Sequence, residues 1–217
     1  MHSFGRLPDA AAWRHEESKD GFEVVFFAQG EDGIRIAGET TAVEEGEPFW
    51  VGYELELDLR WRTRRAHVRG RSSHGAHETV VARDGEGWLV DGLRAPHLDG
   101  IDDVDLEASA MTNAFPVRRM RLEPGVRTDA PAAYVRALDL SVERLDQTYE
   151  RLGDRRYEYD CRRFDFTCEL VYDDAGRAGP GAGLGLAIVA AVATAHDGRV
   201  RLRDACPGTA AVLTLPL

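Results

Sequence analysis

From Trp13 to about Tyr172, apolar and polar side chains alternate with a period of two, which indicates β-strands. The segment from Phe22 to Phe27 is predicted to be a strand that is apolar on both faces. Asp84-Gly85 and Asp91-Gly92 are hairpin signals between short strand-like runs. This spacing predicts an all-β roll, barrel or sandwich. In the clearest strand, one face carries Phe49, Val51, Tyr53, Leu55, Leu57 and Leu59, and the other carries Glu54, Glu56 and Asp58.

The pattern changes at Gly176, where glycines lead into an apolar segment from about Leu184 to His196. We predict a glycine loop, one helix and a terminal hairpin over residues 178–217, joined to a β domain over residues 1–177. The helix has no polar face, so it must be covered. It either docks on the β domain, plugging the mouth of a cavity, or forms a homodimer contact. It is too short to span a bilayer, so stable membrane insertion is not expected.

Charged residues are concentrated between Leu98 and Leu122, among apolar residues at strand spacing. Asp103 and Asp105 are two positions apart, so a strand projects both from one face. Arg118 shares parity with Met120 and Leu122, which predicts an inward guanidinium that needs a carboxylate or a bound anion.

A second inward guanidinium group, that of Arg64, is predicted just before this region. Arg62 and Arg64 share parity with the apolar Ala66 and Val68. We expect Asp103 and Asp105 to pair with Arg64 or Arg118, or else to contact a ligand. A third interpretation is an acid and base pair of a glycoside hydrolase, because two such carboxylates lie roughly 6.5 to 7 Å apart.

Composition narrows the range of partners. The net charge of -11 argues against nucleic acid and anionic membranes, because binding to either depends on clustered cations. The three cysteines form no close pair, and the N-terminus resembles no signal peptide, so we predict a cytoplasmic protein. His67, His74 and His77 lie in and beyond an Arg-rich loop, which favours a solvated loop over a metal site.

Several motifs recur in the order found in the bacterial putative glycolipid-binding family, which residues 13–177 resemble. The resemblance implies a spiral β-roll, related in shape to periplasmic lipoprotein carriers, and a glycolipid or another amphiphile as ligand. The motifs are Trp61-Arg62-Thr63-Arg64, Gly87-Trp88 with Asp91-Gly92, Asp102-Asp103-Val104-Asp105-Leu106, Thr112-Asn113-Ala114-Phe115-Pro116, Arg118-Arg119 and Leu145-Asp146-Gln147-Thr148-Tyr149.

The C-terminal segment resembles the end of a histidine-kinase ATP-binding domain. Residues 181–189 match the second glycine box of that family, and His196-Asp197-Gly198 matches the turn after its helix. The resemblance implies an alternative function as a nucleotide-sensing or kinase-interacting module that uses Gly181, Gly183 and Gly185. The magnesium-binding Asn helix and the adenine-reading loop of such a domain are not recognisable, so we expect no cofactor.

Taken together, these patterns predict a non-catalytic protein that binds an amphiphilic ligand inside an antiparallel, barrel-like β-roll. Aromatic side chains such as Trp61, Trp88 and Tyr149 could line the ligand groove or pack in the core. The predicted ligand-binding residues are Trp61, Arg62, Arg64, Asp103, Asp105, Asn113, Arg118 and Tyr149.

Overall fold

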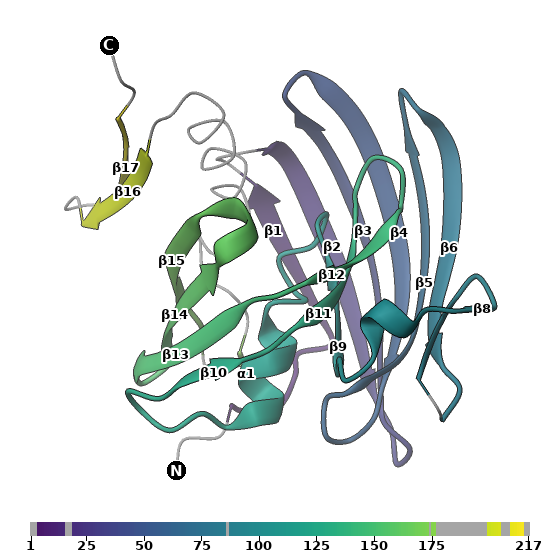
Figure 1. The fold of residues 1–217 in the computed structure, drawn as a ribbon, viewed down its shortest axis with the longest axis horizontal. Helices are drawn as coiled ribbons and strands as arrows, with labels where there is room; N and C mark the ends of the chain where they lie inside the picture. The colour runs from purple at the N-terminus through teal and green to yellow at the C-terminus, as the bar shows by residue number, and fades with distance from the viewer. Residues whose placement is uncertain are drawn as a thin grey trace.

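A long antiparallel sheet forms the first half of the computed structural model, which describes residues 4–15, 19–85, 87–173, 175–176, 199–204 and 209–214 (Figure 1). Its eight strands neighbour one another in chain order, so each connection is a hairpin. β1 and β8 are the two edges, and the sheet remains open. The strands are β1 (Ala10–His15), β2 (Lys19–Gln29), β3 (Ile34–Glu44), β4 (Glu47–Leu57), β5 (Thr63–Ser72), β6 (Gly75–Arg83), β7 (Trp88–Val90) and β8 (Leu93–Arg94).

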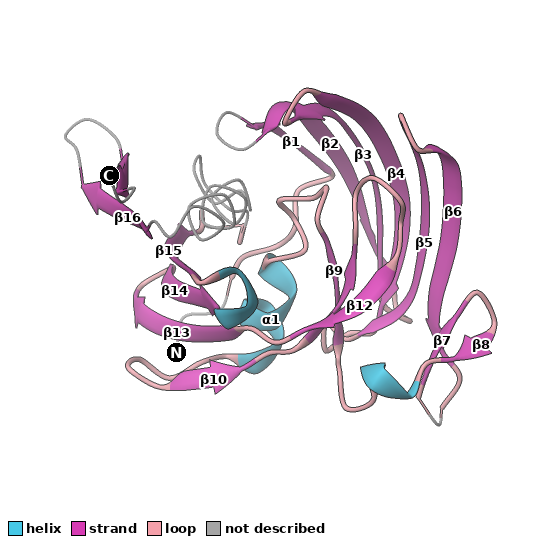
Figure 2. Cartoon of the chain, turned by 45° about the horizontal axis from the view of Figure 1, so that its top comes forward, coloured by secondary structure: helices cyan, strands magenta, loops and turns pink. Residues whose placement is uncertain are grey.

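Two smaller sheets follow, and the long sheet curls around part of them, including β9, β12 and α1 (Figure 2). One has the order β12-β11-β9, in which β9 and β11 are parallel, and the other has the order β10-β13-β14-β15. The elements are η1 (Pro96–Leu98), β9 (Asp103–Leu106), α1 (Ala114–Met120), β10 (Arg127–Asp129), β11 (Ala132–Val135), β12 (Val142–Leu145), β13 (Thr148–Gly153), β14 (Arg156–Cys161), η2 (Arg162–Phe164) and β15 (Phe166–Val171).

The concave face of the long sheet forms one wall of the hydrophobic core. Along β3 every second residue is buried, from Ile34 to Glu44, and the alternation continues in β4 at Val51, Tyr53 and Leu55. The segments after β8 supply the opposing side chains, among them Met111 and Phe115, which are fully buried. Each such side chain contributes about 1.5 to 3 kcal/mol of hydrophobic stabilisation.

The mainly β fold and its hairpins are confirmed. Asp84-Gly85 connects β6 to β7, and Asp91-Gly92 connects β7 to β8. The predicted terminal hairpin is also present, as β16 (Arg199–Asp204) and β17 (Thr209–Thr214). The predicted glycine loop and helix over residues 178–198 lie outside the described residues.

The prediction of continuous strand spacing through Arg118 is wrong. Residues Ala114–Met120 form α1 instead, with the left-handed residue Arg121 after its last turn. Pro116 lies in the first turn of α1, where its missing N–H would have no partner in any case. Arg118 and Met120 therefore do not share a face as they would on a strand.

The two apolar faces of β2 differ in their burial within the described part of the chain. Val25 and Phe27 are buried on the concave face. On the opposite face Phe22, Val24 and Phe26 are 62%, 41% and 60% exposed.

Candidate functional site

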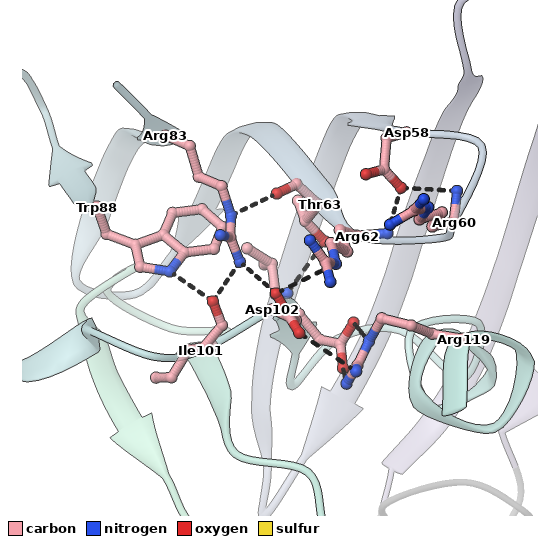
Figure 3. Close-up of polar contacts among 11 residues, drawn as sticks. Asp58, Arg60, Arg62, Thr63, Arg83, Trp88, Ile101, Asp102 and Arg119 are labelled. Atoms are coloured by element: carbon pink, nitrogen blue, oxygen red, sulfur yellow. Dashed lines mark hydrogen bonds and ion pairs between the residues drawn. The ribbon is translucent and has the colours of Figure 1, made fainter. Parts of the chain in front are cut away.

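Three guanidinium groups from separate elements meet at the carboxylate of Asp102 (Figure 3). Arg62, just before β5, approaches with Nε 3.6 Å from Oδ1. Arg83, at the end of β6, donates from Nη2 to Oδ1 at 3.1 Å, and Arg119, on α1, places Nη1 3.3 Å from Oδ2. The Asp102 side chain is 29% exposed, so this cluster, the Asp102 arginine network, reaches solvent.

Asp103 anchors the buried side of the Asp102 arginine network. Arg119 binds it with two bonds, from Nη2 to Oδ2 at 2.6 Å and from Nε to Oδ1 at 3.2 Å. Asp103 is 1% exposed, and burial raises its pKa, whereas the bonds from Arg119 oppose that rise. The expected pairing of Asp103 with Arg64 or Arg118 is thus wrong, because the partner is Arg119.

Arg83 is held in place by several further contacts. Its Nε donates to the carbonyl of Thr63 at 3.0 Å, its Nη2 donates to the carbonyl of Ile101, and its guanidinium lies 4.6 Å from the centre of the Trp88 ring. Trp88 Nε1 donates to the same Ile101 carbonyl at 3.0 Å. These contacts fix Arg83 over a buried tryptophan, with its guanidinium directed at Asp102 (Figure 3).

The turn between β4 and β5 presents Trp61 and Arg62 beside this network. Asp58 Oδ1 accepts hydrogen bonds from the backbone N–H groups of Arg60, at 2.8 Å, and Arg62, at 2.9 Å. Trp61 has a φ of 67°, a left-handed conformation that is strained for a bulky residue. Such strain persists only where surrounding contacts impose it, and here the two bonds to Asp58 do so.

Trp61 and Arg118 form a cation–π contact. The guanidinium of Arg118 lies 4.3 Å from the Trp61 ring and 5.0 Å from the Phe4 ring, and Trp61 packs against Phe115 at 6.0 Å. Arg118 donates to the carbonyl of Ala175, its Nε has no hydrogen-bond partner among the described residues, and burial lowers its pKa to about 10. Arg118 is therefore half-buried against aromatic rings, and Asp173, rather than Asp103 or Asp105, is the carboxylate whose charge opposes the fall in its pKa.

Arg64 does not point inward, because a β-bulge reverses the strand parity at this position. Leu57 pairs with Thr63 while Glu56 pairs with Arg65, so Arg64 is an extra residue in the ladder. Thr63 and Ala66 are fully buried, and Arg64 is exposed, donating to the carbonyl of Asp32 at 3.0 Å. The predicted inward position of Arg64 is wrong for this reason, and Arg62 likewise lies in solvent contact.

The other predicted site residues are buried and bonded to one another or to neighbours. Asp105 accepts a hydrogen bond from Thr112 Oγ1 at 2.7 Å, its Oδ2 has no partner among the described residues, and burial raises its pKa to about 6. Tyr149 donates from its hydroxyl to Asn113 Oδ1 at 3.0 Å. These three side chains are at most 2% exposed and are separated from solvent by the surrounding packing.

A second polar cluster, which the sequence analysis missed, lies on the concave face of the long sheet. Glu23 is fully buried and accepts hydrogen bonds from Tyr53 Oη at 2.5 Å, Ser109 Oγ at 2.5 Å and the backbone N–H of Ala110 at 2.8 Å. Burial raises the pKa of Glu23, and these donors oppose the rise. The sequence carried a signal for this cluster, since Glu23 shares parity with Val25 and Phe27.

Lys19, the only lysine, lies in the same inner region and is 5% exposed. Its Nζ donates to the carbonyl of Glu107 at 2.6 Å. Burial lowers the pKa of Lys19, and nearby carboxylates, of which Glu44 has the largest effect, oppose the fall. Burial also raises the pKa of Glu44 to about 7 and lowers that of His15 to about 4.

The described residues hold neither a cluster of metal-ligating side chains nor a membrane-spanning helix. They contain no group of three His, Cys, Asp or Glu side chains placed to hold a metal ion. His67 instead contacts Glu78, with Nε2 2.5 Å from Oε1. Within the same part of the chain, no helix has the length and apolarity needed to cross a bilayer.

Comparison with known proteins identifies the family. The family model described as Putative glycolipid-binding matches residues 10–177. The chain belongs to this family. A crystal structure of a DUF1089 family protein from Pseudomonas aeruginosa is similar, with 30% sequence identity, a TM-score of 0.65, and coverage of 78% of this chain and 93% of that one. No curated protein matches the chain.

The family match supports a binding role and includes every residue of the Asp102 arginine network. The region resembling a histidine kinase begins after the matched residues, and no comparison supports that resemblance. Within the family region, the structure brings together four motifs that are far apart in sequence. They are Trp61-Arg62-Thr63, Gly87-Trp88, Asp102-Asp103 and Arg118-Arg119.

Proposed function

We propose that this member of the family is a non-catalytic binding protein for an amphiphilic ligand, such as a glycolipid, whose polar or anionic head group meets the Asp102 arginine network. The observation that carries the proposal is the convergence of Arg62, Arg83 and Arg119 on the single carboxylate of Asp102. Arg119 also binds Asp103, and Arg83 also binds the carbonyls of Thr63 and Ile101. Arg62 approaches Asp102 through Nε, so its Nη groups can donate to a second acceptor.

The exposures of the side chains favour access by a ligand. The Arg62 side chain is 47% exposed and that of Arg83 is 32% exposed. Trp61, beside them, presents a half-buried indole ring for the apolar part of the ligand. A net charge of -11 over the whole chain makes a local group of arginines a specific site rather than part of a broadly basic surface.

The burial of Asp103 and Asp105 favours a binding function over glycoside hydrolysis. An acid and base pair must reach the substrate, yet Asp103 and Asp105 are 1% and 2% exposed. Asp103 is also bound by Arg119, which favours its charged form. We therefore assign the two carboxylates to positioning the arginines and the surrounding strands.

The proposal is tested by native mass spectrometry of the full chain purified from cells without detergent. We expect a co-purifying lipid adduct with the wild type and its loss with Arg62→Ala, because Arg62 contributes a donor without being part of the core. Asp102→Asn should retain the adduct or increase its occupancy for an anionic head group, since the arginines lose their internal counter-charge. Arg69→Ala, an exposed arginine of β5 outside the network, is the matched control.

Two outcomes contradict the proposal. One is the absence of any lipid adduct on the wild-type protein. The other is equal adduct occupancy in the wild type and the Arg62→Ala variant, which would show that the ligand does not contact the Asp102 arginine network.

A further inference from the structure

The convex face of the long sheet carries a groove of about 670 Å³ that the proposed function does not use. It lies at the end of the sheet where the hairpins between β3 and β4 and between β5 and β6 turn. Trp50 in this groove and Leu57 near the Asp102 arginine network are seven residues apart on β4, which is about 23 Å of strand. The groove is therefore a surface separate from the Asp102 arginine network.

The floor of this groove, the Trp50 groove, is built by the strand register. Phe22 of β2 pairs with Thr41 of β3, Thr41 pairs with Trp50 of β4, and Trp50 pairs with Arg71 of β5. These four side chains consequently form one row across the convex face. Val43, which is 46% exposed, lies beside the row and adds to its apolar surface.

The indole of Trp50 lies over the sheet in this row. A Cβ atom placed on Gly52 would come within 2.8 Å of Trp50 Cζ2 and within 3.3 Å of its Cη2, so the ring occupies the space above Gly52. The six-membered ring of the indole is the part that lies over Gly52, and Trp50 is half-buried while lining the groove. The absence of a side chain at Gly52 is what allows the ring to lie across the strand.

Polar side chains surround the aromatic floor, and their charges balance. Asp20 and Arg71 contribute one charge of each sign and Thr41 contributes a hydroxyl group, whereas the hydroxyl groups of Ser72 and Ser73 donate to the carbonyl of Leu138 and to Glu47. An anionic ligand would meet no surplus of positive charge here. A neutral ligand with one apolar face and several hydroxyl groups matches both the ring and the rim.

We propose that the Trp50 groove is a binding site for a neutral saccharide, whose C–H face stacks on the Trp50 indole and whose hydroxyl groups bond to Arg71, Asp20 and Thr41. A pyranose ring has this combination of an apolar face and equatorial hydroxyl groups. The volume of about 670 Å³ is in the range of small-molecule sites and holds one or two sugar units. The site goes beyond the proposed function, since it lies on another surface and does not use the Asp102 arginine network.

The test is saturation-transfer difference NMR of the full chain with methyl β-glucoside, methyl β-galactoside and methyl α-mannoside. We expect saturation of the ring C–H protons of at least one glycoside in the wild type and loss of that signal in Trp50→Ala. Gly52→Ala should reduce the signal at least threefold, because the new methyl group displaces the indole without removing it. Phe26→Ala, an exposed aromatic of β2 outside the groove, should leave the signal unchanged.

Circular dichroism verifies that each variant is folded, and Gly52→Ala and Arg71→Ala decide the outcome if Trp50→Ala does not fold. The proposal is overturned if none of the three glycosides receives saturation from the wild type, or if Trp50→Ala and Arg71→Ala both retain the wild-type signal. It is also overturned if light scattering shows a dimer that Trp50→Ala dissociates, because the groove would then be covered by a second copy. Asp102→Asn should not change the glycoside signal, which separates this test from that of the proposed function.

Discussion

At the scale of single residues, buried charge decides which side chains can be substituted without a large loss of stability. Asp103 is 1% exposed, and Arg119 is the cation bonded to both of its carboxylate oxygens. Removing one partner of such a pair leaves an uncompensated charge in a medium of low polarity, which costs more than the pair itself contributes. Glu23 is buried as well, and its carboxyl group accepts hydrogen bonds from three neutral donors.

Arg119→Met should lower the free energy of unfolding by about 3 kcal/mol, because Asp103 remains buried without its cation. For a chain of this size the thermal midpoint should fall by roughly 6 to 12 °C. The measurement is thermal and urea unfolding followed by circular dichroism. The double variant Arg119→Met, Asp103→Asn should recover most of the loss, and an Arg119→Met protein as stable as the wild type would show that the pair does not hold this region.

Gly38→Ala should disturb the Glu23 cluster through Tyr53. A Cβ atom at Gly38 would lie 2.4 Å from the Tyr53 ring, so the ring must move away from Glu23, at a cost of about 1 to 3 kcal/mol. Urea unfolding measures the loss. Gly30→Ala is the matched control, because nothing lies within 4 Å of its Cβ position, and an equal loss in both variants would contradict the explanation.

At the scale of elements, local irregularities place the side chains of the candidate site. The bulge at Arg64 turns that residue outward while Thr63 and Ala66 both remain inward. Strand parity in the sequence assumes an unbroken ladder, so it could not predict this reversal. The short helix α1 likewise directs Arg118 to Trp61 and Arg119 to Asp103, two different surroundings for adjacent residues.

Asp58→Ala should loosen the turn that presents Trp61 and Arg62. The variant loses two hydrogen bonds from backbone N–H groups to the carboxylate, at about 1 kcal/mol each, and the left-handed conformation of Trp61 is then less constrained. Amide hydrogen exchange at Arg60 and Arg62 should become faster. Asp58→Asn keeps an acceptor oxygen and should resemble the wild type, and unchanged exchange in Asp58→Ala would refute this role for the carboxylate.

At the scale of the whole molecule, the inner face of the long sheet links stability to pH. Burial raises the pKa of Glu44 from 4.5 to about 7, so the folded state holds this proton more tightly than the unfolded state. The stabilising contribution is complete below about pH 4.5 and is lost as the pH rises through 7. His15 acts in the opposite direction, because its pKa falls from 6.5 to about 4, and its contribution is lost as the pH falls through that range.

Glu44→Gln isolates the first of these effects, since His15 is common to both proteins. The rise in pKa of Glu44 corresponds to about 3 kcal/mol. The free energy of unfolding of the variant, relative to the wild type, should therefore increase by about that amount between about pH 4 and about pH 8. Urea unfolding at the two pH values measures the difference, and a difference independent of pH would exclude Glu44 as the titrating group.

The sequence by itself determined the fold class and most of the hairpins. Alternation in β3 and β4 and the Asp-Gly turns are local properties, because side-chain direction in a strand and turn conformation depend on a few neighbouring residues. Family motifs in the sequence likewise identified Trp61, Arg62, Asp103 and Arg118 as notable residues. Their partners were not predictable in the same way.

Only the tertiary structure decided which charges meet. The sequence around Arg83 does not indicate a role in a site, yet β6 brings this residue to Asp102. The bulge before Arg65 excludes Arg64 from the core. Ion pairs between distant segments depend on register and on helix orientation, neither of which is encoded in a single short stretch. The Trp50 groove arises in the same way, because four strands must align before Phe22, Trp50 and Arg71 form one row.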